Sequence, residues 1–308
     1  MDNIVVVGSV ALDSVKTLEG ESQEALGGSA VYFSLAARFF SPVSMVGVAG
    51  KDFPKKHREM LQGRGVDLSG FQTVEGKTFR WVGEFGKDLS AAKTLATHLN
   101  VFETFRPDLN DGHRDSKVVF LANIDPELQA DVLSQMRKPS LVACDTMNYW
   151  ISSKKAALKE LLSRVNIFFV NEEEAKSLTG KRSALSAAET LCEWGPSVVV
   201  VKKGEHGAVM QAGKRFFAFP AFPTREVKDP TGAGDSFAGA FMGYLASSHR
   251  PQQVESLKRA LLYGTVMASF NVEDFSTRSL EALERPVLDR RFNDFLDALS
   301  VAPDRVPA

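Results

Sequence analysis

The chain has 308 residues, of which 44% are hydrophobic and 24% charged, as is typical of a soluble globular protein with a substantial core. Its 37 Lys and Arg residues almost balance its 38 Asp and Glu residues, so the net charge gives no reason to expect a nucleic-acid or membrane partner. The two cysteines indicate neither a disulfide framework nor a zinc site, and no apolar run approaches the roughly 20 residues that span a bilayer. The apolar stretch that starts at Ile4 is too short for a secretory signal, so we expect a cytoplasmic enzyme.

Five short apolar runs rich in β-branched residues predict strands that are buried on both faces, because polar residues do not alternate with the apolar ones. These runs are Ile4–Val7, Val118–Ala122, Leu141–Ala143, Ile167–Val170 and Val198–Val201. Helix-like stretches lie between the later runs, namely Pro126–Met136, Ser153–Arg164 and Ser183–Glu193. Strands and helices that alternate in this way predict an α/β fold with a mostly parallel sheet.

Polar residues follow every one of these runs. In chain order they are Asp13, Asn123, Asp145, Asn171 with Glu174, and Lys202 with Gly204. Single Asp and Asn residues also start turns and cap helices, so each is ordinary by itself. Open α/β sheets bind ligands at the carboxyl ends of their strands, and the repeated pattern therefore predicts a ligand site at this edge.

The stretch from about 66 to 105 interrupts the alternation of strands and helices. Within it, Phe79, Trp81, Gly83 and Phe85 recur with the period of two that half-buried antiparallel strands show. We predict a small β appendage built from about residues 66–105 together with 10–22. Our interpretation is a lid that excludes water from the site, and a plain surface hairpin is the alternative.

A glycine-rich turn, Gly232-Ala233-Gly234-Asp235, precedes the small-residue helix predicted at Ser236–Ala246. Glycines let a backbone approach an anion, and the first amides of a helix point outward at its positive end. A Walker loop is excluded because no Lys follows at its spacing, and Phe237 occupies the third glycine position of a dinucleotide fingerprint. The residues alone thus indicate either an anion site beside a catalytic carboxylate or a helix start with a favourable acidic residue.

The segment Asp229–Phe237 resembles the carboxyl-terminal signature of the ribokinase-like (PfkB-type) carbohydrate kinase family. Gly27–Ala30 is similar to the family's amino-terminal signature, Asn171–Glu174 to its Asn-x-x-Glu motif, and Val201–Gly207 to its nucleotide loop. These matches occur in family order over nearly the whole chain. The resemblance implies a single domain over residues 1–308, folded as a ribokinase-like three-layer sandwich with a β lid. It also implies an ATP-dependent kinase that uses Mg²⁺.

The resemblance assigns roles to individual residues. Asp235 would be the base that deprotonates the acceptor hydroxyl, and the amides of Gly232, Ala233 and Gly234 would stabilise the γ-phosphate during transfer. Glu174 would help to hold Mg²⁺ through water, and Asp229 lies in a loop where several members hold K⁺. The acceptor would contact Asp13, Gly27, Gly28, Tyr32, Arg80 and Asn123. ATP would contact Asn171, Lys202, Gly204, Gly207, Thr231 and Asn271.

Three departures from the family pattern leave the acceptor and the ion requirement open. Tyr32 replaces an Asn that often contacts the sugar, so it either stacks on a flatter acceptor or simply packs. Lys202 replaces a common Thr and either contacts ATP phosphates or faces solvent. Pro230 replaces a Thr, which removes a hydroxyl and an N–H.

We therefore expect transfer of the γ-phosphate of ATP to a hydroxyl of a sugar or related polyol. A nucleoside kinase is the alternative, and a non-catalytic nucleotide-binding regulator is a less favoured one. Pairing of lid strands along an exposed edge would give a homodimer. The final residues, Val301–Ala308, are expected to form a loose tail.

Overall fold

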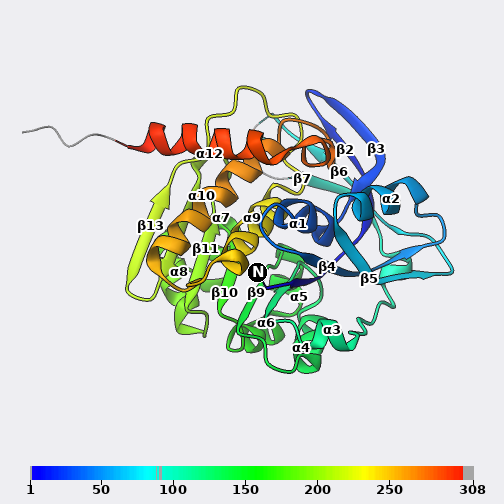
Figure 1. The fold of residues 1–308 in the computed structure, drawn as a ribbon, viewed down its shortest axis with the longest axis horizontal. Coiled ribbons are helices and arrows are strands. Elements are labelled where there is room, and N and C mark those ends of the chain that lie inside the picture. The colour runs from blue at the N-terminus through cyan, green and yellow to red at the C-terminus, as the bar shows by residue number, and fades with distance from the viewer. Residues whose placement is uncertain (1, 88, 90–91, 301–308) are drawn as a thin grey trace, which may run out of the picture.

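The computed structural model describes residues 2–87, 89 and 92–300. Over these residues, nine strands form a large sheet in the order β13-β12-β11-β10-β9-β8-β1-β4-β5. Four further strands of the same described part form a small sheet in the order β3-β2-β6-β7, which lies at one side of the molecule (Figure 1). The tail expected at Val301–Ala308 lies outside the described residues.

The large sheet is parallel from β5 to β11 and ends in an antiparallel hairpin of β12 and β13. In sheet order the strands are β13 Arg215–Phe219, β12 Ala208–Ala212, β11 Val198–Lys202, β10 Ile167–Asn171, β9 Leu141–Cys144, β8 Val118–Leu121, β1 Ile4–Val7, β4 Val43–Gly50 and β5 Val66–Val74. The five apolar runs predicted as strands are confirmed, and they form the five adjacent strands from β11 to β1.

The sheet is buried on both faces because its side chains alternate between two hydrophobic cores. In β1, Ile4 and Val6 contribute to one core, whereas Val5 and Val7 contribute to the other. The helices that supply most of the first core are α1 Ser29–Ala37, α9 Ala233–Ser247, α10 Val254–Asn271, α11 Arg278–Ala282 and α12 Arg285–Leu299, and Leu61 of α2 (Lys55–Gly63) also belongs to it. The helices that supply the second are α4 Pro126–Gln135, α5 Asn148–Ser153, α6 Lys155–Leu162, α7 Glu172–Thr179 and α8 Ala184–Glu193. The three-layer α/β architecture is therefore confirmed.

Two short helices lie near the edge strand β5, and they are α2 Lys55–Gly63 and α3 Asp111–Arg114. None of the helices in the described part of the chain is long and apolar enough to cross a membrane.

The helix expected over Ser153–Arg164 is in fact two helices. Its beginning belongs to α5, and α6 starts only at Lys155, because the backbone of Lys154 has non-helical angles (φ −136°, ψ 36°). The Nζ of Lys154 lies 2.7 Å from Oδ2 of Asp125 at the start of α4. This ion pair joins the residue at the break to the start of α4.

The small sheet, called the lid sheet below, consists of β3 Gly20–Gly27, β2 Ala11–Thr17, β6 Phe79–Phe85 and β7 Ala92–His98. Its extent corrects the expectation that residues 66–105 form the appendage. Residues 66–74 instead form β5, which pairs in parallel with β4 at the edge of the large sheet. Edge position explains the error, because Asp67 and Ser69 of β5 face solvent and give it the polar pattern of a surface hairpin.

Candidate active site

The glycine turn begins α9 directly above an aromatic ring. Gly232 precedes the helix with φ 75°, in the left-handed region that favours glycine. A Cβ on Gly232 would lie 2.4 Å from the ring of Tyr32, so the turn packs against that ring. The amide of Ala233, one of the three expected around the γ-phosphate, already donates to the carbonyl of Pro230 (3.1 Å). The following amides of this first turn have no intrahelical acceptor and suit an anionic ligand.

Asp235 is partly exposed in the first turn of α9. A catalytic base must be accessible to its substrate, and this position meets that condition. Desolvation by the surrounding protein, together with the negative charge of Asp145, raises the pKa of Asp235 to about 7, although Lys202 opposes the shift. A carboxylate with this pKa is well matched to accept a proton near neutral pH.

Lys202 lies between the glycine turn and the end of β9. Its Nζ is 2.7 Å from Oδ2 of Asp145, and a Cβ on Gly234 would lie 2.8 Å from the same Nζ. Burial works against the charge of Lys202, but the carboxylates of Asp145 and Glu174 outweigh burial and raise the pKa of Lys202. The alternative in which Lys202 faces solvent is therefore wrong, and its side chain is only 17% exposed.

The residues expected to hold the acceptor hydroxyls meet at the base of the lid sheet. Asp13 in β2 is 8% exposed, and a Cβ on Gly27 would lie 1.9 Å from its Oδ2. Gly28 has φ 101°, and a Cβ there would lie 2.4 Å from the carbonyl oxygen of Ser9. Burial, followed by the charges of Asp229 and Asp235, raises the pKa of Asp13 to about 7. The structure thus brings Asp13 into the electrostatic range of the proposed base.

Three other residues expected at the acceptor lie in different settings. Tyr32 is 2% exposed, so in this structure it packs beneath Gly232. Arg80 pairs with Glu24 and Asp52 (both 2.8 Å) and also donates to the carbonyl of Thr78 (3.1 Å), so it ties the lid sheet to the body. The Oδ1 of Asn123, just after β8, is buried and has no partner among the described residues.

Asn171 and Glu174 form a capping box at the start of α7. The side chain of Asn171 accepts from the amide of Glu174 (2.8 Å), and Oε2 of Glu174 accepts from the amide of Asn171 (2.9 Å). Burial and the charge of Asp145 raise the pKa of Glu174 to about 7, against the effect of Lys202. No group of three His, Cys, Asp or Glu side chains within residues 2–87, 89 and 92–300 is arranged to hold a metal. A Mg²⁺ ion would therefore need phosphate or water oxygens as well as Glu174.

Asp229 joins the glycine turn to the loop after α10. Its Oδ1 accepts from the amide of Thr231 (2.9 Å) and its Oδ2 from the amide of Ser276 (3.1 Å). The side chain of Asn271, at the end of α10, donates to the carbonyl of Thr231 (2.7 Å). The Oγ1 of Thr231 and the Oδ1 of Asn271 are buried without a partner in the described part of the chain. Buried oxygens without a partner are places where a water molecule or an ion can bind.

The expected nucleotide loop is a tight turn between β11 and β12. A 3₁₀ helix spans Gly204–His206, and the amide of Lys203 donates to the carbonyl of Gly207 (2.8 Å). Gly207 has φ 83°, and a Cβ on it would lie 2.0 Å from the carbonyl oxygen of Phe219. Glycine is therefore required at this position to bring the turn close to β13.

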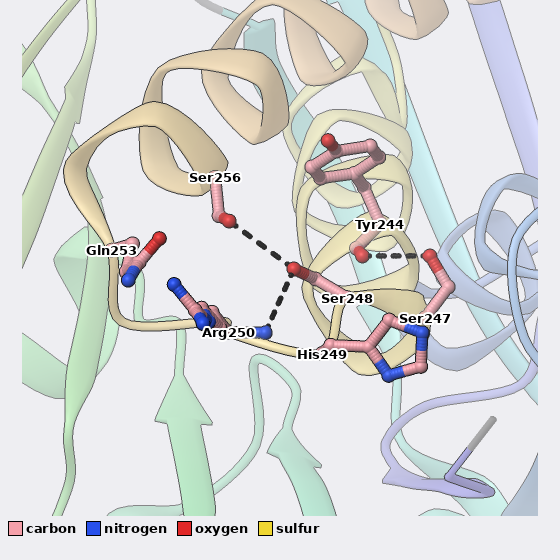
Figure 2. Close-up of a pocket in the computed structure, with 7 residues that line it drawn as sticks. All are labelled: Tyr244, Ser247, Ser248, His249, Arg250, Gln253 and Ser256. Atoms are coloured by element: carbon pink, nitrogen blue, oxygen red, sulfur yellow. Dashed lines mark hydrogen bonds between the residues drawn. The ribbon is translucent and has the colours of Figure 1, made fainter.

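One hollow of the surface lies away from these residues, at the opposite end of α9 from Asp235. Figure 2 shows its lining, in which the hydroxyl of Ser248 lies 3.1 Å from that of Ser256. The same hydroxyl accepts from the amide of Arg250 (3.3 Å). These contacts close the turn between α9 and α10, and the hollow has no link to the site described above.

The sequence profile of the pfkB family carbohydrate kinases matches residues 1–283 of the chain. A cytidine kinase from Thermococcus kodakarensis is 33% identical over 267 residues, which cover 84% of this chain and 93% of that protein. A nucleoside kinase from Methanothermobacter thermautotrophicus is 25% identical over 292 residues, which cover 88% of this chain and 84% of that protein.

Solved structures share the fold at lower identity. A nucleoside kinase from Methanocaldococcus jannaschii has a TM-score of 0.76 at 21% identity and covers 96% of this chain and 99% of its own. A ribokinase from Thermotoga maritima has a TM-score of 0.75 at 22% identity and covers 96% and 100%. The protein is a phosphotransferase whose acceptor is an alcohol group. From its motifs, its fold and these matches, the chain belongs to the pfkB family of carbohydrate kinases.

Proposed function

We propose that the protein transfers the γ-phosphate of ATP to a hydroxyl of a sugar or related polyol, with Asp235 as the base. The observation that carries this proposal is the position of Asp235, which lies in the first turn of α9 beside amides that suit a phosphate. The charge of Asp235 contributes to the raised pKa of Asp13, which supports an acceptor site next to the proposed base.

ATP would lie along the carboxyl ends of β10 and β11, with its triphosphate on the glycine turn. Mg²⁺ would compensate the charge of the phosphate oxygens when bound. The Oε1 of Glu174, which the capping box does not use, would hold the ion through water. The residues proposed to contact ATP are Asn171, Lys202, Gly204, Gly207, Thr231 and Asn271. An ATP-dependent role favours a cytoplasmic location.

The lid sheet would close over the acceptor and exclude water from the transfer. The ion pair of Arg80 with Asp52 supports this role, because it fixes the base of β6 to the loop after β4. Leu18 and Leu95, on the turn and on the edge strand of this sheet, are exposed. Such an edge would allow two copies to pair as a homodimer.

A K⁺ ion would fit between the glycine turn and the loop after α10. The unpartnered Oγ1 of Thr231 and Oδ1 of Asn271 are hard oxygen donors of the kind that such an ion prefers. A fructokinase from Vibrio cholerae with the same fold (TM-score 0.79) was solved with fructose, ADP and potassium. The ion would act by fixing the turn that receives the phosphate.

A nucleoside is the second candidate acceptor, because the 33% identical relative is a cytidine kinase. Aromatic residues of the lid sheet could stack on a base, but two of them are already engaged in contacts within the protein. Trp81 covers Gly83 and donates to Thr94 (3.1 Å), and Phe79 packs against Phe102.

An acceptor screen tests the proposal and separates the two candidates. ADP release would be measured with Mg·ATP and ribose, fructose, inositol, cytidine, uridine or inosine, in KCl and in choline chloride. We expect turnover with one class of acceptor and higher rates in KCl. Turnover only with nucleosides would replace the sugar assignment, and absence of turnover with all acceptors would contradict the proposal.

The catalytic rate is expected to fall in acid. Asp235 must be deprotonated to accept a proton, and its pKa is raised to about 7. The rate should therefore decline about tenfold per pH unit below about pH 7 and level off above it. Measurement of kcat at saturating ATP and acceptor across this range checks the expectation, and a rate that stays constant down to about pH 5 would contradict it.

A further inference from the structure

The contact between Lys202 and Asp145 is a buried ion pair at the phosphate site. Asp145 is 4% exposed in its side chain and Lys202 17%, and they approach to 2.7 Å. The ammonium also lies against the backbone of Gly234, where a Cβ would come within 2.8 Å of Nζ. A buried pair is weak evidence for stabilisation, because desolvation offsets much of its attraction. Its place suggests a use in binding or catalysis instead.

The two partners differ in how firmly they are held. The carbonyl of Asp145 accepts from Nε2 of Gln129 (3.0 Å), a fully buried side chain that also bonds the carbonyls of Leu121 and Ala122. The Oδ1 of Asp145 accepts from the amide of Thr146 (2.8 Å). Asp145 is therefore fixed to the ends of β8 and β9. Lys202 holds its ammonium on a flexible four-carbon stem and can move.

The ammonium contacts one carboxylate directly, that of Asp145 at 2.7 Å. The carboxylates of Glu174 and Asp235 also favour its charged form. A triphosphate that settles on the glycine turn brings more negative charge to within reach of Nζ. Attraction to this charge competes with the ion pair, because the phosphate oxygens become a second partner for the same ammonium.

We propose that Asp145 holds the ammonium of Lys202 beside the glycine turn in the absence of ATP, and that Lys202 moves from Asp145 to the phosphates when ATP binds. The inference rests on the proposed function, since it takes ATP as the ligand of this site. The exchange breaks one ion pair and forms another, with no covalent step. Lys202 then compensates charge on the transferred group, and Asp145 is a positioning residue that acts through Lys202.

Exchange predicts that loss of the Lys202 ammonium weakens ATP binding, whereas loss of the Asp145 charge does not. Lys202→Met removes the partner of the phosphates, so the Kd of Mg·ATP should rise about tenfold or more. Asp145→Asn keeps the shape but removes a competitor for the ammonium, so the Kd should stay equal or fall. Both variants should lower kcat. Lys202→Met removes the ammonium, and in Asp145→Asn the ammonium is no longer held in position beside the glycine turn. The double variant should bind ATP as weakly as Lys202→Met alone.

The test is titration calorimetry with Mg·ATP in the absence of acceptor, followed by kcat with the acceptor found in the screen. Lys55→Met is the matched control, because its exposed Nζ lies 3.0 Å from Oε1 of Glu59 on α2, outside the candidate site, and its loss should leave both quantities unchanged. Thermal unfolding checks that each variant folds, and Asp145→Ser replaces the Asn variant if that one does not fold.

Weaker ATP binding in the Asp145 variant would overturn the inference, because Asp145 would then be a metal ligand or one half of a purely structural ion pair with Lys202. Unchanged binding in Lys202→Met would overturn it as well. The proposed function fails separately, when the wild-type protein phosphorylates no acceptor. In that case the ATP affinities of the variants still test whether Lys202 moves. A wild-type protein that does not bind ATP contradicts both the proposed function and the exchange.

Discussion

Replacement of Asp235 by Asn is expected to lower kcat by about a thousandfold while Mg·ATP still binds. The amide has the shape of the carboxylate but cannot accept the proton of the acceptor hydroxyl. Amides at the start of α9 do not depend on this side chain, so the phosphate site should survive. Turnover and ATP affinity of the same purified variant check both halves of the expectation.

Asp131→Asn is a suitable control for this variant, because Asp131 lies exposed on α4, away from the glycine turn. It should keep wild-type kcat. A folded Asp235→Asn protein with near-normal turnover would remove Asp235 from the role of base. Loss of ATP binding together with turnover would indicate that the substitution had disturbed the turn itself.

Gly27→Ala is expected to raise the KM for the acceptor about a hundredfold, with little change in ATP affinity. The added Cβ would lie 1.9 Å from Oδ2 of Asp13, so the carboxylate has to move away from its present place. Displacement of this magnitude should cost most of the hydrogen bonding to an acceptor diol. Steady-state kinetics with varied acceptor at saturating ATP measure the effect.

Gly63→Ala provides the matched comparison, because a Cβ at this position in α2 meets nothing within 4 Å. The control should have wild-type kinetics. An unchanged acceptor KM in Gly27→Ala would show that Asp13 does not hold the acceptor where this structure places it. A tenfold or greater loss of ATP affinity would place the effect on the nucleotide side instead.

Five strands of the central sheet, β1 and β8 to β11, could be predicted from the sequence because they are continuous apolar runs, whereas β5, β12 and β13 were not predicted as part of it. β4 was missed although every residue in it is buried. Glycines interrupt its pattern, and they are disfavoured in strands on propensity alone. Gly47 is there for a tertiary reason, since a Cβ on it would meet the side chain of Val10 at 2.9 Å. Local patterns cannot reveal a requirement that is set by a distant part of the chain, here the loop between β1 and β2.

Part of the candidate site could also be predicted from the sequence. Parallel strands place their carboxyl ends at one edge, so the polar residues after the runs were expected to gather, and Asp145 does lie close to Lys202. The pairing itself could not be predicted, because 57 residues and the intervening strand β10 separate the two partners. Which side chain reaches across depends on its length and on the turn behind it. The position of Arg80 between Glu24 and Asp52 could not be predicted from a local pattern either, because it depends on the lid sheet as a whole.

Tyr32 has a consequence for attempts to redesign acceptor preference. Its ring comes from the helix that follows the acceptor signature, yet it supports Gly232 in the turn that would receive the phosphate. A smaller residue at position 32 would enlarge the space for the acceptor. It would also remove the ring against which Gly232 of the turn packs. Selectivity and transfer rate should therefore be difficult to alter independently at this position. A library aimed at new acceptors is better started at positions of the lid sheet that do not contact Gly232, such as Trp81, whose indole N–H donates to Thr94 within the lid sheet.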